Sequence, residues 1–126
     1  MVKVYATRKL PEQALDLLRS EGVDFSFNSK DEPPTERALI EEVSDVEGLI
    51  CLLTEKITQN IIDAGKNLRV IANIAVGYDN IDVRKATEKG IYVTNTPGVL
   101  TETTADLAWA LLMATARRIA EADRFL

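Results

Sequence analysis

Residues 73–98 read NIAVGYDNIDVRKATEKGIYVTNTPG and contain one strand, turn, helix and strand in succession. The apolar run Val70–Ala75 that leads into this segment is typical of a buried parallel strand. Asp82 can cap a short helix, and Gly90 can end that helix just beyond its last turn. The apolar residues 91–94 then form the next strand. The segment therefore predicts a parallel strand pair with a helical crossover.

The rest of the chain repeats this strand and helix unit. Strands are expected at 2–6, 23–27, 48–53, 70–75 and 91–94. Helix starts are expected at Pro11, Thr35, Thr58, Asp82 and Thr101. Because such crossovers are right-handed, helices should cover both faces of the sheet. We predict an α/β fold in three layers, with a flavodoxin-like parallel five-stranded sheet in the order 2-1-3-4-5 and a long C-terminal helix at 101–126.

In a sheet of this kind, ligands bind beyond the carboxyl ends of the strands. That edge should gather Thr7-Arg8, Leu53-Thr54, Ala75–Gly77 and Thr96-Pro97. If the peptide N–H groups around Val76 and Gly77 face outward, they form a small concavity suited to a carboxylate. Gly77 has no Cβ, so a ligand can come close to its backbone. The sequence therefore predicts a site for a small anion at this edge.

Composition excludes several classes of function. The 126 residues amount to one domain, and 46% hydrophobic with 28% charged residues is ordinary for a folded chain. The net charge of -5, without a dense basic patch, argues against a nucleic-acid or anionic-membrane surface. The longest apolar stretch, near 107–116, is too short to span a bilayer, and the start MVKVYATRKL has no signal-peptide core. We expect a cytoplasmic protein with no membrane partner.

The reactive residue types are sparse. Cys51 is the single cysteine, and its place in the apolar run GLICLL favours a small buried hydrophobe over a nucleophile. The chain has no histidine, which removes the commonest general base and metal ligand. Its six glycines never fall in G-x-G spacing, so no dinucleotide fingerprint is present. We predict no catalytic residue and no metal site in this chain.

Two segments together carry a family resemblance. AVGYDNIDV at 75–83 and KGIYVTNTPGVLTETTADLA at 89–108 resemble the signature of the D-2-hydroxyacid dehydrogenases. Glyoxylate and hydroxypyruvate reductases are the members most similar to it. The resemblance is dense from 68 to 112 and continues back to Lys3.

The resemblance implies roles for four residues. The backbone at Val76 and Gly77 would bind the carboxylate of a 2-keto or 2-hydroxy acid, and Leu53 would pack against the same substrate. For Leu53, simple closure of the core is the open alternative. Thr104, together with Val76, would reach the nicotinamide end of NAD(P) in the full-length parent enzyme. No cofactor is expected to bind this chain alone.

The resemblance also divides the chain. Residues 1–100 would be the substrate-binding lid domain and 101–126 an interdomain helix. The dinucleotide-binding domain, with the family's arginine and its histidine paired with a carboxylate, is expected to be absent from these residues, which leaves them inactive alone. The final helix is apolar nearly all round, so it expects two partners. We predict that it packs back on the sheet in a monomer, with a helix-swapped dimer as the alternative.

Three other interpretations remain open. A flavin-binding electron carrier should have a Ser, Thr and Gly loop after the first strand, whereas this chain has TRKLPEQ at 7–13. A phospho-receiver module should end its third strand in aspartate, whereas this chain has CLLT at 51–54. An excised or engineered folding unit of flavodoxin-like topology would have no activity at all.

Overall fold

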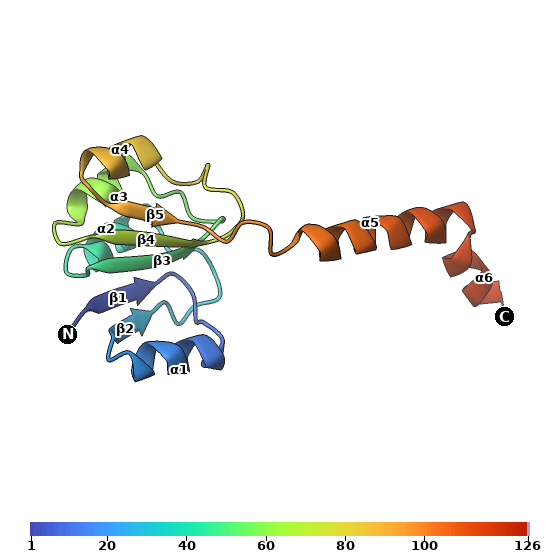
Figure 1. Ribbon diagram of the computed structural model, residues 1–126, viewed down its shortest axis with the longest axis horizontal. Helices are drawn as coiled ribbons and strands as arrows, with labels where there is room; N and C mark the ends of the chain where they lie inside the picture. Colours follow the sequence, from blue (N-terminus) through green and yellow to red (C-terminus); the bar gives the residue numbers. More distant parts are fainter. Residues whose placement is uncertain (126) are drawn as a thin grey trace. The chain divides into compact units, whose positions relative to one another are not determined.

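The computed structural model describes residues 1–125 and contains one parallel sheet (Figure 1). Its strands are β1 (Lys3–Ala6), β2 (Asp24–Phe27), β3 (Gly48–Leu52), β4 (Val70–Ile74) and β5 (Tyr92–Thr94). They are ordered β2-β1-β3-β4-β5, and every neighbouring pair is parallel. The predicted fold class and strand order are confirmed. All five strands therefore bring their carboxyl ends to the same edge.

Helices follow the strands in alternation. They are α1 (Glu12–Ser20), α2 (Glu36–Val43), α3 (Gln59–Ala64), α4 (Val83–Glu88), α5 (Thr101–Ala116) and α6 (Ile119–Phe125). The chain forms two compact units, of which the first is Met1–Thr96 and the second begins at Pro97. The sheet and helices α1 to α4 make up the first unit. Helices α5 and α6 belong to the second.

The two faces of the sheet are covered by different helices. Because side chains alternate along a strand, Leu49 of β3 packs with α2, α3 and α4, whereas Ile50 packs with α1. The larger cluster is the core of the first unit, and its buried Leu49, Ile61 and Ile71 are completely inaccessible to solvent. Each such side chain contributes about 1.5–3 kcal/mol by leaving water.

Two predicted helix caps and one predicted stop are confirmed. The Thr35 hydroxyl accepts a hydrogen bond from the N–H of Ala38 at 3.3 Å. The Asp82 carboxylate accepts one from the N–H of Lys85 at 2.9 Å. Both bonds satisfy N–H groups that have no partner inside the helix. Gly90 follows α4 with a φ of 70°, the left-handed conformation in which glycine avoids a steric penalty.

Two other predicted caps form differently. Thr58 occupies the capping position of α3, but its hydroxyl donates to the Glu36 carboxylate at 2.6 Å. A charge-assisted bond of this kind is stronger than a neutral cap. Thr101 is the first residue of α5, and the position before it is Leu100, with no side-chain cap. Leu100 already has helical dihedrals (φ -110°, ψ -6°), so the chain enters the helix without the extended residue that a capping side chain needs.

The predicted single C-terminal helix over 101–126 is wrong. Helix α5 ends at Ala116 and α6 begins at Ile119, because Arg118 adopts a left-handed φ of 52°. That conformation is unfavourable for a residue with a Cβ. The Arg118 guanidinium donates to the carboxylate of Glu121, in the first turn of α6, at 2.6 Å.

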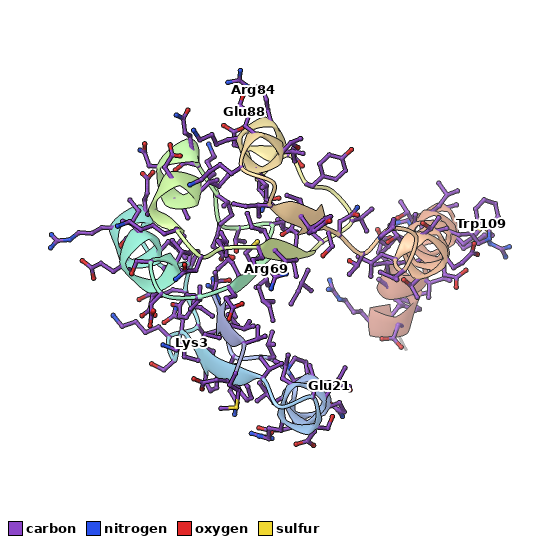
Figure 2. All side chains as sticks on the ribbon, turned by 60° about the vertical axis from the view of Figure 1, so that its left-hand side comes forward. Lys3, Glu21, Arg69, Arg84, Glu88 and Trp109 are labelled. Atoms are coloured by element: carbon purple, nitrogen blue, oxygen red, sulfur yellow. The ribbon has the colours of Figure 1, made fainter. Side chains whose placement is uncertain are left out.

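The apolar side chains of α5 are largely exposed. Trp109, which projects from the helix in Figure 2, is 65% exposed, and Leu107, Leu111 and Leu112 are 57–61% exposed. That this helix packs back on the sheet stays a prediction, and Leu126, its predicted end, lies outside the described residues. Within residues 1–125, no helix is both long and apolar enough to cross a membrane.

Surface charges of the first unit form local pairs. Arg84 and Glu88, one turn apart on α4, point away from the sheet and lie 3.9 Å from each other (Figure 2). Exposed pairs of this kind contribute only about 0.3–0.5 kcal/mol. The stability of the first unit therefore comes mainly from its core and its buried polar groups.

Candidate anion-binding site

The loop after β4 has its carbonyl groups tied to the protein. The side-chain amide of Asn95 donates to the Val76 carbonyl at 2.7 Å, and that of Asn73 donates to the Gly77 carbonyl at 2.9 Å. In a trans peptide the N–H points opposite to the C=O. The N–H groups of Gly77 and Tyr78 therefore point away from these two amides.

The carbonyl of the preceding peptide is bonded to the protein as well. The N–H of Thr96 donates to the Ala75 carbonyl at 2.8 Å, which directs the N–H of Val76 to the other side. Within residues 1–125, the N–H groups of residues 76–78 have no protein acceptor. We refer to these three N–H groups as the cradle. Successive outward N–H groups of this kind bind small anions.

Gly77 lies at the centre of the cradle. A Cβ built on it would lie 3.0 Å from an oxygen of the Asp79 carboxylate, and apart from its chain neighbours Val76 and Tyr78 no other described residue has an atom within 4 Å. The space in front of its backbone is therefore open except at this carboxylate. Absence of a side chain keeps that space free for a ligand.

Leu53 lies in the turn after β3 and is 67% exposed. It therefore does not close the core, which was the open alternative for this residue. Val76 and Tyr78, at the same edge of the sheet, are 43% and 55% exposed. Apolar surface thus lies beside the cradle and is available to a ligand.

Glu55 anchors the turn that carries Leu53, and sequence reasoning missed it. Its side chain is completely buried. Its carboxylate accepts four hydrogen bonds, from the Thr7 hydroxyl (2.8 Å), Arg8 guanidinium (3.2 Å), Leu52 N–H (2.8 Å) and Thr54 hydroxyl (2.6 Å). A buried carboxylate is stable only when it is paired and hydrogen-bonded in this way.

Asn73 and Asn80 were also missed. Asn73 is 2% exposed, and its side-chain amide donates to the Asn80 side-chain oxygen at 2.9 Å as well as to Gly77. Asn80 in turn donates to the carbonyls of Leu52 and Glu55 at 3.1 and 3.0 Å. A polar residue inside the apolar strand VIANI was the available signal for Asn73. The partner that satisfies it is set by the tertiary fold.

Thr104 belongs to the second unit. It lies in the first turn of α5, where its N–H donates to the Leu100 carbonyl at 2.9 Å and its side chain is exposed. The structure thus brings together the loops of Leu53, Val76 and Gly77 in the first unit. A contact of Thr104 with a nicotinamide stays a prediction.

Cys51 is buried as predicted, and its thiol donates to the Asn73 side-chain oxygen at 3.5 Å. Burial, followed by the negative charge of Glu55, raises the pKa of Cys51 from 9.0 to about 12. At pH 8 we expect the native thiol to react with Ellman's reagent roughly a thousandfold more slowly than the thiol in urea, because reactivity follows the thiolate fraction. Equal rates in the two states would contradict this environment.

The raised pKa of Cys51 also makes the stability of the protein depend on pH. The native value lies above the unfolded one, so this group's contribution to stability is fully present below pH 9 and is lost as the pH rises from 9 to about 12.

Known proteins are similar to this chain over nearly its whole length. Residues 4–122 match the family model described as D-isomer specific 2-hydroxyacid dehydrogenase, catalytic domain. The chain belongs to this family. Curated relatives include the glyoxylate reductases of Korarchaeum cryptofilum, 51% identical over 124 residues, and Thermococcus kodakarensis, 50% identical over 123 residues. Each alignment covers 98% of this chain and 37% of the relative.

Two solved structures are similar to this chain over nearly its whole length. The TT0316 protein from Thermus thermophilus has a TM-score of 0.88 and 43% identity, and the match covers 98% of this chain and 40% of that one. An NADPH-dependent glyoxylate/hydroxypyruvate reductase from Sinorhizobium meliloti, in complex with citrate, has a TM-score of 0.76 and 32% identity. That match covers the whole of this chain and 38% of the other. The chain therefore spans less than half the length of these relatives.

Proposed function

We propose that residues 1–96 bind the carboxylate of a small 2-keto or 2-hydroxy acid, as the substrate-side part of a dehydrogenase of this family. The cradle is the observation that carries the proposal, because three successive N–H groups at the carboxyl edge of the sheet have no protein acceptor within residues 1–125. A carboxylate presents two oxygens that can accept from such donors. No side-chain cation is required.

The Asp79 carboxylate, beside Gly77, opposes the binding of an anion. Its side chain is exposed, and the repulsion between two such charges in water is about 1 kcal/mol at 4 Å. A hydrogen bond to a charged group contributes about 1.5–3 kcal/mol. Two or more cradle bonds therefore outweigh this repulsion.

The acid that binds at the cradle is expected to be small. Leu53, which is exposed at the same edge, would pack against the carbon atoms of the acid. The relatives at about 50% identity are named glyoxylate reductases, and glyoxylate is the smallest 2-keto acid. We infer that the whole protein reduces glyoxylate or hydroxypyruvate-type acids to the corresponding hydroxy acids.

The residues present do not fit a dinucleotide site. The six glycines never fall in G-x-G spacing, so no loop of that type can hold a pyrophosphate. A nicotinamide cofactor, NAD or NADP, would supply the hydride in the whole protein. Contacts of Val76 and Thr104 with it remain part of the proposal, and we derive no step through the cofactor.

Nuclear magnetic resonance of the 15N-labelled 126-residue chain tests the proposal. Titration with glyoxylate is expected to shift the amide signals of residues 76–78 in a saturable way, because these N–H groups would donate to the carboxylate. Glycolaldehyde, which has no carboxylate, should leave them unchanged. Absence of a response to millimolar glyoxylate would contradict the proposed function.

Gly77→Val is the matched variant. Its Cβ would lie 3.0 Å from the Asp79 carboxylate, and the two methyl groups would fill the space in front of the cradle. We expect the glyoxylate dissociation constant to rise at least roughly tenfold while the signals of the core remain in place. An unchanged dissociation constant would remove Gly77 from the site.

A further inference from the structure

Asn80 connects the two loops at the carboxyl edge of the sheet. Its side-chain amide donates one hydrogen bond to the Leu52 carbonyl at 3.1 Å and another to the Glu55 carbonyl at 3.0 Å. These carbonyls lie on either side of the Leu53 turn. Both amide hydrogens are thus used to hold the two ends of one turn.

The oxygen of the Asn80 side chain is connected through Asn73 to the carbonyl side of the cradle loop. Its oxygen accepts from the side chain of Asn73 at 2.9 Å, and Asn73 also donates to the Gly77 carbonyl at 2.9 Å. A continuous hydrogen-bonded path therefore runs from the Leu53 turn to the last peptide of the cradle, between Gly77 and Tyr78. Networks in which every donor and acceptor is used hold their members in one arrangement.

The backbone supports the same connection. The N–H of Ile57 donates to the Asn80 carbonyl at 2.8 Å, and the N–H of Asp82 donates to the Ile57 carbonyl at 3.0 Å. These bonds form a parallel bridge between the two loops. The two loops are thus joined near Ile57 by backbone bonds. Closer to the strands, the Asn80 side chain joins the turn that carries Leu53 to the turn that carries Gly77.

We propose that Asn80 is a positioning residue for substrate size. By holding the Leu53 turn at a set distance from the cradle, it determines how large a group can follow the carboxylate of the bound acid. The inference rests on the proposed function of the cradle and adds to it. A rigid apolar wall discriminates between acids that differ by a methylene, typically by about 10- to 200-fold. An apolar wall that can move aside does not discriminate between such acids.

Asn80 does not touch the acid in this proposal, so its role differs from that of Gly77. It is half-buried, and its removal opens the carbonyls of Leu52 and Glu55 to water rather than leaving a cavity in the core. The backbone bridge at Ile57 also remains. We therefore expect the variant to fold and to keep its cradle.

Titration of the 126-residue chain with glyoxylate and with the bulkier 4-methyl-2-oxopentanoate tests the inference, by the same amide signals of residues 76–78. In the wild type, glyoxylate should bind at least roughly tenfold more tightly than 4-methyl-2-oxopentanoate. In Asn80→Ala this preference should fall to about one, and the methyl signals of Leu53 should no longer respond to the acid. Asn80→Asp, which has the same size but cannot donate at neutral pH, should behave like Asn80→Ala.

The control is Asn60→Ala, which removes an exposed side-chain amide of α3 that donates to Glu36 of α2 at 3.3 Å. It should keep the wild-type preference. If Asn80→Ala or Asn80→Asp folds and keeps the preference while the cradle still responds, the inference is overturned and the proposed function stands. If the wild-type cradle responds to neither acid, both are overturned. Should Asn80→Ala fail to fold, Asn80→Asp decides.

Discussion

The 126-residue chain alone is expected to give no NADH-dependent reduction of glyoxylate above the buffer rate. Hydride transfer to a keto acid needs a bound nicotinamide, and an acid that protonates the developing alkoxide. The chain has no histidine and no G-x-G loop. General acid–base help alone contributes about 10²- to 10⁴-fold, so its loss is sufficient to abolish detectable turnover.

Absorbance at the NADH band, followed with millimolar glyoxylate, measures this rate. The full-length glyoxylate reductase of Thermococcus kodakarensis, 50% identical over 123 residues, is the positive control. Turnover by the chain that survives repurification would contradict the prediction. Binding of glyoxylate without turnover would support the division between a substrate-binding unit and the chemistry.

The sheet could be predicted from the sequence because its signals are local. An apolar run such as Val70–Ile74 between a glycine stop and a polar turn has few alternatives to a buried parallel strand. Asp82 and Gly90 fix both ends of one crossover helix by their own backbone preferences. Once the units alternate, the handedness of the crossovers leaves few orders for the strands.

The end of the chain shows what local signals miss. The residues Arg117-Arg118 do not predict the end of a helix, since arginine is a good helix former. The break lies at Arg118, which adopts a left-handed φ of 52°. Thr58 is similar, because a competing carboxylate from α2 takes its hydroxyl. Such partners are supplied by the folded chain.

The candidate site divides in the same way. The position of Val76 and Gly77 just beyond the end of a parallel strand could be predicted from the sequence, whereas their part in a site stays a prediction. Glu55 could not, since it pairs with Thr7 across 48 positions of the chain. A glutamate in a polar loop is ordinarily exposed. Only the fold shows that this one is buried.

Glu55→Ala is expected to lower the free energy of unfolding of the chain by about 3–5 kcal/mol, which is the typical effect of removing one partner from a buried charged network. The remaining groups lose their partner and stay out of water. Here they are the Thr7 hydroxyl and the Leu52 N–H, whereas the Arg8 guanidinium, whose side chain is 13% exposed, keeps its bond to the Thr7 carbonyl. Urea unfolding followed by circular dichroism measures the change.

Two variants make this result decisive. Glu32→Ala removes an exposed glutamate from a loop and should stay within about 0.5 kcal/mol of the wild type. Glu55→Gln keeps the size of the side chain, but its amide nitrogen cannot accept hydrogen bonds, so an intermediate loss is expected. The free energy of unfolding of a domain is only about 5–15 kcal/mol, so Glu55→Ala can unfold the chain completely. In that case the smaller loss in Glu55→Gln still measures the effect. A loss below about 1 kcal/mol in Glu55→Ala would mean that water replaces the carboxylate, and that the Leu53 turn is held by Asn80 and the backbone bridge at Ile57 instead.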